Sequence, residues 1–134
     1  DESTDLWLTY ATYPFDSTGN DYADYSVFTD EYRSSIIENS KKSIMDERYE
    51  FDLLFTTEEF KKINEKTFLC FEYDGLLWEE YLDDYSLPEI FDEIVYIVLV
   101  NGKLHNFMLY IEETYFSEED RNAMSHVIES IDFK

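Results

Sequence analysis

The chain has 134 residues, with 32 Asp and Glu against 10 Lys and Arg, a formal net charge of −22, yet 19% of its residues are aromatic. That aromatic content excludes an acidic disordered tail, because such tails lack the side chains that build a core. We expect residues 1–134 to form a single domain in which 1–5 are a flexible lead-in. The charge predicts no nucleic-acid partner and favours a basic protein as partner.

The sequence shows no sign of a transmembrane segment or of a disulfide bond. The longest uninterrupted apolar run, residues 94–100, is too short to cross a bilayer, so we expect no transmembrane segment. A single cysteine, Cys70, excludes an intrachain disulfide. Because the sequence starts at Asp1 rather than at Met, we expect any targeting segment or lipid anchor to lie outside it.

The N-terminal half begins with a strand and continues with a helix. Residues 6–13 are rich in aromatic and β-branched side chains and alternate, which predicts a strand ended by Pro14. From 30 to 48 apolar residues recur at helical spacing between charged ones, which predicts an amphipathic helix. Thr29 or Asp30 is placed to cap its start.

The middle of the chain predicts shorter elements. We expect a short strand over 49–55, a capped helical turn over 56–60, and a strand over 67–74 ended by Gly75. Residues 76–92 mix aromatic and acidic side chains, and their pattern fits a strand, a short helix or a structured loop equally well.

The C-terminal third contains the strongest local signal. Two β-rich runs, 93–100 and 103–112, flank Asn101 and Gly102, a pair that suits the positive φ angles of a two-residue hairpin turn. This turn pairs Val100 with Lys103, and both faces of the hairpin are then apolar, so we expect both to be covered. One face carries Ile94, Tyr96, Val98, Phe107, Leu109 and Ile111, and the other carries Val95, Ile97, Leu99, Leu104, Met108 and Tyr110.

A helix is expected after the hairpin, with Ser117 as its cap. Its predicted inner stripe comprises Asp120, Ala123, Met124, Val127, Ile128 and Ile131. This helix covers one face of the sheet, and the helix over 30–48 or a partner covers the other. The predicted fold class is therefore α+β: an antiparallel β-sheet with helices packed on its faces and a C-terminal β-hairpin followed by a helix.

Four segments of this C-terminal third share an order and spacing with a known family: 95–103 (VYIVLVNGK), 105–110 (HNFMLY), 116–120 (FSEED) and 128–133 (IESIDF). This ending resembles that of PsbP-like domains, which close with a hairpin, a helix and an I-x-S-I-x-F finish. The resemblance implies an α/β/α sandwich without catalytic activity, in bacteria often a secreted lipoprotein, and it carries over no functional residue. The N-terminal half departs from the family, with a long acidic helix in place of some strands.

Catalytic and metal sites have weak support in this sequence. Chance alone pairs carboxylates in a chain with so many, and a catalytic pair needs two carboxylates in different environments. Residues 16–21 offer oxygen ligands without the order of an EF-hand calcium loop. His105, His126 and Cys70 are too few and too scattered for a structural zinc site. Acids surround Cys70, which favours a buried small hydrophobe over a nucleophile. We therefore predict no enzyme, no cofactor and no metal.

One stretch within the ambiguous region combines rings with carboxylates at high density. We predict that this stretch forms a partner-facing surface, with the candidate residues Trp78, Glu79, Glu80, Tyr81, Asp83, Asp84 and Tyr85. Aromatic rings supply contact area and carboxylates steer a basic protein, although the same rings would also suit a core beneath a solvated acidic face.

Two functions from different classes follow. The first is a non-enzymatic ligand- or protein-binding domain of a secreted or surface-anchored bacterial protein. The alternative is an intracellular, cytoplasmic acidic inhibitor, such as an immunity protein or a nucleic-acid mimic, that binds a basic protein. The precursor sequence distinguishes them, because a signal peptide with a lipid-attachment cysteine supports the first and a start Met near Asp1 supports the second.

Overall fold

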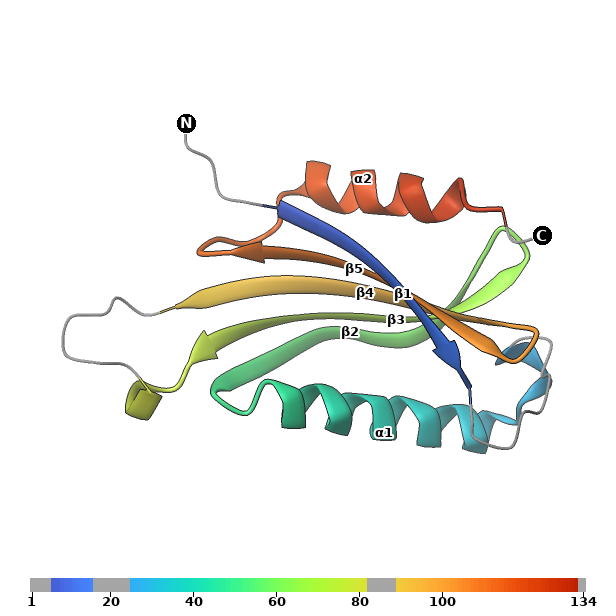
Figure 1. Ribbon diagram of the computed structural model, residues 1–134, viewed down its shortest axis with the longest axis horizontal. Helices are drawn as coiled ribbons and strands as arrows, with labels where there is room; N and C mark the ends of the chain where they lie inside the picture. The colour runs from blue at the N-terminus through green and yellow to red at the C-terminus, as the bar shows by residue number, and fades with distance from the viewer. Residues whose placement is uncertain (1–5, 16–24, 82–88, 133–134) are drawn as a thin grey trace.

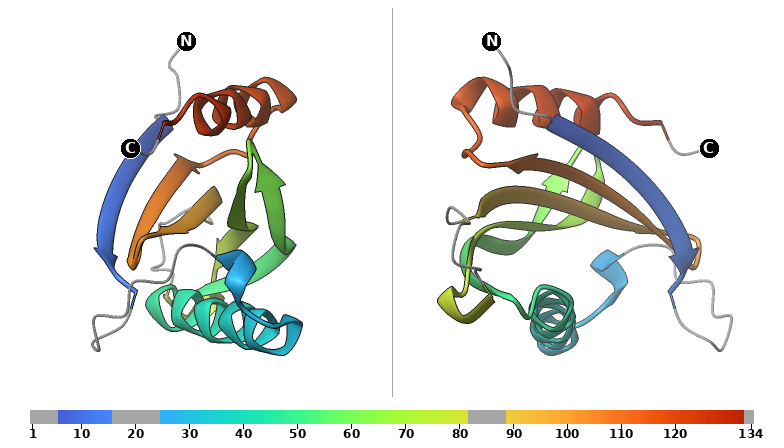
Figure 2. Two further views of the ribbon diagram at one scale, coloured as in Figure 1. Left: turned by 90° about the vertical axis from the view of Figure 1, so that its right-hand side faces the viewer. Right: turned by 60° about the vertical axis from the view of Figure 1, so that its left-hand side comes forward.

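One antiparallel sheet of five strands, in the order β1-β5-β4-β3-β2, carries a helix on each face (Figures 1 and 2). This computed structural model describes residues 6–15, 25–81 and 89–132. The described elements, in chain order, are β1 (Leu6–Pro14), a 3-10 turn η1 (Tyr25–Val27), α1 (Asp30–Glu47), β2 (Phe51–Ile63), β3 (Lys66–Leu77), a 3-10 turn η2 (Glu79–Tyr81), β4 (Ile90–Val100), β5 (Lys103–Glu112) and α2 (Glu118–Glu129). The predicted α+β class is confirmed.

The β4–β5 hairpin has the predicted turn and register. Asn101 and Gly102 have φ angles of 50° and 81°, and Val100 pairs with Lys103 across them. Because a two-residue turn fixes the register of the whole hairpin, the two predicted apolar faces follow from it. Each face belongs to a different hydrophobic cluster.

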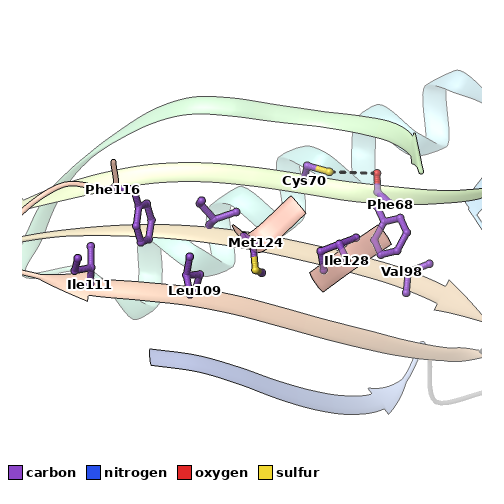
Figure 3. Packing of buried hydrophobic residues seen from close by; sticks show 9 residues of the cluster. Phe68, Cys70, Val98, Leu109, Ile111, Phe116, Met124 and Ile128 are labelled. Carbon is purple, nitrogen blue, oxygen red and sulfur yellow. Dashed lines mark hydrogen bonds between the residues drawn. The ribbon is translucent and has the colours of Figure 1, made fainter. Parts of the chain in front are cut away.

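The core therefore consists of two layers, one on each side of the sheet. The layer beneath α2 contains Phe68, Cys70, Ile94, Val98, Leu109, Ile111, Phe116, Met124 and Ile128 (Figure 3). The layer on the α1 side contains Tyr25, Phe28, Leu69, Phe71, Tyr73, Phe91, Val95 and Leu99. Both faces of the sheet are thus covered over its central strands.

Both helices begin at a predicted cap. The Thr29 side chain accepts a hydrogen bond from the Tyr32 backbone N–H at 3.1 Å. Ser117 and Asp120 form a reciprocal capping box at the start of α2. The predicted inner stripe of α2 is too wide, because Met124 and Ile128 are buried while Val127 is 37% exposed.

The predicted helical turn over 56–60 is wrong, because β2 runs straight through it. Pairing with β3 along the whole length of β2 outweighs the local cap-like sequence. A register shift between Phe55 and Thr57 adds one residue at Thr56, which interrupts the alternation that identifies a strand in sequence.

Gly75 does not end β3, which continues to Leu77. The aromatic ring of Phe91 lies over the Gly75 backbone, and a Cβ built there would stand 2.4 Å from Phe91 Cε2. The glycine therefore makes room for a neighbouring ring inside a strand. In the ambiguous stretch over 76–92, the structure describes the end of β3, η2 and the start of β4, and residues 82–88 lie outside the described ranges.

The strand β1 is the edge of the sheet beside β5, and it differs from the other strands in burial. All nine of its residues are exposed, whereas β3 and β4 are largely buried. It is held by the β5 ladder and by ring contacts, such as Tyr10 against Phe107 at 4.9 Å between centroids.

Candidate functional site

Three of the few cations of this protein form ion pairs between its layers. In the described ranges, four of the ten Lys and Arg residues form ion pairs with carboxylates: Arg33, Lys41, Arg48 and Arg121. Three of these pairs join a helix to the sheet, namely Lys41–Glu58, Arg48–Glu93 and Arg121–Glu72. The carboxylates that they neutralise are a small part of the 32, so the surface stays strongly negative.

The predicted partner-facing stretch is exposed where the structure describes it. Trp78 is 46% exposed and Tyr81 is 42% exposed, and Glu80 is exposed beside them. Of Glu79 the structure describes the backbone, within η2. Asp83, Asp84 and Tyr85 lie outside the described residues.

The structure adds two members that the sequence did not predict. The backbone N–H of Trp78 donates to the backbone carbonyl of Glu50 at 2.8 Å, and the Tyr49 ring meets the Tyr81 ring edge-on with centroids 6.0 Å apart. Tyr49 is 64% exposed. The aromatic–acidic surface therefore comprises Tyr49, Glu50, Trp78, Glu80 and Tyr81.

Strand pairing brings these two segments together. Phe51 pairs with Leu77, so the residues just before β2 meet those just after β3. The register of the β2–β3 hairpin was the signal that would have found Tyr49 and Glu50. The sequence does not reveal this register, because the two-residue turn of the hairpin is Asn64–Glu65. Glu65 has a φ of 71°, an angle that glutamate seldom adopts, so the pair does not look like a turn in sequence.

Negative charge acts directly on the rings of this surface. The pKa of the Tyr81 phenol is raised by partial desolvation, and then by the neighbouring Glu80, Tyr49 and Glu50. Carboxylates beside aromatic faces favour a cation, which gains both ion pairing and contact with the ring. The arrangement therefore suits a Lys or Arg side chain of a partner.

An ion pair between half-buried Arg48 and buried Glu93 adjoins this surface. Arg48, which caps the C-terminus of α1 and directly precedes Tyr49, places a guanidinium nitrogen 3.2 Å from Glu93 Oε1. The Tyr73 hydroxyl donates to the same carboxylate oxygen at 2.5 Å. The guanidinium lies 4.7 Å from the centroid of Phe91 and 5.3 Å from that of Tyr110. Burial lowers the Arg48 pKa, but the charge and hydrogen bond of Glu93 outweigh it, so the pKa is raised overall.

Little of this network is open to solvent. Glu93 is 1% exposed and Tyr73 is 2% exposed, and the Tyr73 pKa is raised by burial and by Glu93. A group that acts on a substrate must reach it within hydrogen-bond distance. The geometry is that of a compensated buried charge, which fixes the end of α1 to the sheet.

A second buried acid lies next along β4 but on the opposite face. Asp92 is 3% exposed and accepts a hydrogen bond from the Phe116 N–H at 3.0 Å. Desolvation raises its pKa to about 6, against the lowering effect of that hydrogen bond. A raised carboxyl pKa marks catalytic acids when a cleft accompanies it. Asp92 instead ties the segment before α2 to the sheet.

An open hollow of about 310 Å³ lies between α1 and the sheet, with Ser40, Ser43, Ile97, Asn106 and Met108 among its lining residues. Within the described part of the chain, Asn106 Oδ1 is the buried side-chain oxygen without a hydrogen-bond partner. Water cannot reach this oxygen, and therefore a ligand in the hollow cannot reach it without moving the side chain. The hollow is also at the small end of ligand pockets.

The cysteine and the histidines considered in the sequence analysis show no sign of a catalytic or metal site. Cys70 is 4% exposed, and burial raises its thiol pKa to about 12, which opposes nucleophilic use. His105 forms a 2.7 Å hydrogen bond with the Tyr10 hydroxyl, and His126 is exposed on α2. Residues 16–21 lie outside the described ranges.

Metal and membrane features are not found in what the structure describes. Among residues 6–15, 25–81 and 89–132, no three His, Cys, Asp or Glu side chains are grouped so as to hold a metal ion. No helix in these ranges has the length and apolar character needed to span a bilayer.

The comparisons with known proteins add no family. No protein-family model matches this chain, and no curated protein matches it. The resemblance of its C-terminal third to PsbP-like domains therefore stays a prediction.

Proposed function

We propose that this protein is a non-enzymatic binding domain that uses the aromatic–acidic surface to bind a basic protein. The observation that carries the proposal is the exposure of Trp78 and Tyr81 beside carboxylates, in a protein with a net charge of −22. Aromatic residues on a surface are the usual anchors of interfaces, and neighbouring carboxylates speed the encounter with a basic partner.

The closed character of the buried acids supports a binding role over a catalytic one. Glu93 is paired with Arg48 beneath the surface, and Asp92 is held by a backbone N–H on the far face of the sheet. Neither carboxylate lies open in a cleft, where an acid–base pair would be expected.

Two settings for such a domain remain as proposals. The resemblance to PsbP-like domains supports a secreted or surface-anchored bacterial protein, whose lipid anchor would lie outside this sequence. The excess of carboxylates supports an intracellular acidic inhibitor that covers a basic active site. Both settings assign the same surface to the partner.

Binding to an array of Lys- and Arg-rich peptides tests the proposal. Fluorescence of Trp78, isolated by Trp7→Phe, reports the contact when the tightest peptide is titrated in solution. We expect Trp78→Ala, measured by calorimetry, to weaken binding by about tenfold or more, as for interface anchors. We expect Glu80→Gln to weaken it more at low salt than at high salt.

Two matched variants control for general effects. Tyr115→Ala removes an equally exposed ring between β5 and α2, and Glu38→Gln removes an exposed charge on α1. Both should leave affinity unchanged. Equal losses in all four variants, or no peptide binding at low salt, would refute the assignment of this surface.

A further inference from the structure

The edge strand β1 lacks the charge that characterises the rest of the protein. Residues 6–15 (LWLTYATYPF) form the longest run without Asp, Glu, Lys or Arg in a chain of which 31% is charged. Every residue of β1 is exposed, including Leu6 at 45%, Leu8 at 51% and Tyr10 at 54%. An uncharged, exposed strand thus forms one border of an acidic protein, as Figure 2 shows for its position.

The backbone of β1 offers hydrogen bonds on its outer side. The Phe15 N–H donates to the Gly102 carbonyl at 2.9 Å, which sets the alternation along the strand. Residues 7, 9, 11 and 13 therefore point their N–H and C=O groups toward β5, and residues 6, 8, 10 and 12 point theirs away. Pro14 falls in the second set, where its missing N–H costs the ladder nothing.

Among the described residues, Pro14 is the one feature of this edge that usually protects against pairing. Edge strands in monomers are typically short, or they carry lysines, inward-pointing charges or a bulge. β1 is nine residues long, has no charged side chain, and pairs with β5 without a register shift. Its proline lies at the last position and leaves the preceding outward N–H groups in place.

Charge favours a second copy of this chain as the occupant of this edge. A basic partner would gain nothing here, because the strand has no carboxylate to offer. A second copy of this chain, also at −22, is repelled by most of the surface and can approach best where charge is absent. The uncharged edge therefore fits another copy of itself.

We propose that two copies pair through β1, antiparallel and about a twofold axis at Thr9, into one continuous ten-stranded sheet. This register uses all the outward N–H and C=O groups of residues 6, 8, 10 and 12, since it places 6 opposite 12 and 8 opposite 10. A shift in either direction leaves some of these groups unpaired or sets one against Pro14.

The side chains agree with the same register. On one face Leu8 meets Tyr10 of the second copy, and on the other face Trp7 meets the small Ala11. Thr9 meets its own symmetry mate, a pair that is favourable in sheets. A single strand pair is a small interface, so we expect a dissociation constant on the order of 10–100 µM.

A self-opposed charge tests the pairing in sedimentation equilibrium. Thr9→Lys places two like charges opposite each other and should weaken the dimer by about tenfold or more, although it lowers the overall repulsion. The matched control Ser34→Lys adds the same charge on the exposed side of α1 and should not weaken it. Circular dichroism checks that both variants are folded.

A pair of cysteine variants tests the register. Thr9→Cys should form a disulfide-linked dimer on mild oxidation, because Cα atoms of a non-hydrogen-bonded pair lie about 4.5 Å apart. Ala11→Cys lies on the same face, but its two copies would be about 13 Å apart, too far for a disulfide. The native Cys70 is 4% exposed and should not contribute.

The outcomes separate this proposal from the proposed function. The dimer should strengthen as salt rises, because salt screens the repulsion between copies, and Trp78→Ala should leave it unchanged. Binding of a basic peptide to the aromatic–acidic surface should instead weaken as salt rises. A wild-type monomer at about 1 mM, a Thr9→Lys dimer as tight as wild type, or equal cross-linking of both cysteine variants overturns the pairing.

Discussion

The two helices hold the same sheet in different ways. α2 buries Met124 and Ile128 in the layer shown in Figure 3. α1 is longer, at 18 residues against 12, yet it has no buried residue. Its isoleucines Ile36, Ile37 and Ile44 are only partly buried against the other face.

Cations take the place of deep burial on the α1 face. Arg33, Lys41 and Arg48 lie 5.8, 5.0 and 4.7 Å from the ring centroids of Phe60, Phe55 and Phe91. Lys41 and Arg48 also pair with Glu58 and Glu93 of the sheet. The charged ends of these side chains lie over aromatic rings and also meet carboxylates. A chain rich in acids and aromatic residues can thus attach a helix with three cations.

The largest effect on stability is expected at Arg48. Arg48→Ala leaves the Glu93 carboxylate buried without a cation, and we expect a loss of about 3–5 kcal/mol in the free energy of unfolding. Urea denaturation measures it, and Lys42→Ala, an exposed cation of the same helix, is the control. The double variant Arg48→Met with Glu93→Met should recover much of the loss. If Arg48→Ala costs no more than the control, charge does not hold this end of α1.

On the other face, Met124→Ala tests attachment by burial. The side chain is 2% exposed, so its truncation should cost about 2–4 kcal/mol through lost burial and the cavity left behind. Met45→Ala on α1 is the matched control, because that side chain is 50% exposed and should cost under about 1 kcal/mol. Equal losses at the two methionines would show that both helices are attached alike.

Asp92 makes stability on the α2 face depend on pH. Its pKa rises from 3.8 to about 6 on folding, so the folded protein binds this proton more readily than the unfolded chain. Its contribution to stability is therefore lost as pH rises from about 4 through 6 and is regained on acidification. Asp92→Asn should stabilise the protein by about 1–2 kcal/mol at pH 7 and reduce the gain in stability between pH 7 and 5. Thermal unfolding over this pH range measures it, with the exposed Asp52→Asn as control. A wild-type pH dependence retained in Asp92→Asn would exclude this carboxyl as its source.

The smallest effect is expected at Lys41. Its ion pair with Glu58 is partly exposed, at 28% and 34% of the two side chains, so Lys41→Met should cost less than about 1 kcal/mol. That cost should shrink between low salt and 0.5 M NaCl as the pair is screened. Met124→Ala serves as the contrast in the same titration, because loss of apolar burial carries no screened charge. A cost at Lys41 that does not change with salt would place its role in packing over Phe55 instead.

The sequence predicted elements whose signals are local. The Asn101–Gly102 turn, the alternating strands beside it and the caps at Thr29 and Ser117 are read within a few residues, and all are present. The middle of the chain failed because its structure depends on a distant partner. β2 is a strand through its pairing with β3, and its bulge at Thr56 hides the alternation.

The members of the aromatic–acidic surface also differ in whether a local sequence signal reveals them. Trp78 and Tyr81 stand out by composition, and they are exposed. Tyr49 and Glu50 join them only through the register of two strands. Arg48 and Glu93 are 45 residues apart, and with 32 acids in the chain no pattern marks which carboxylate is buried against which cation.

The position of β1 also sets an order of assembly. Leu6 pairs with Ile111 and Pro14 with Lys103, so the first described strand leaves the ribosome long before its partner exists. Bringing β1 to β5 closes the whole chain segment between Pro14 and Lys103 into a loop. This step is slow compared with forming the β2–β3 and β4–β5 hairpins, whose turns contain two residues each. We therefore expect β1 to join a preformed four-stranded meander as a late step of folding. Until then, its uncharged, aromatic sequence has no strand to pair with, and we expect chaperones to bind it.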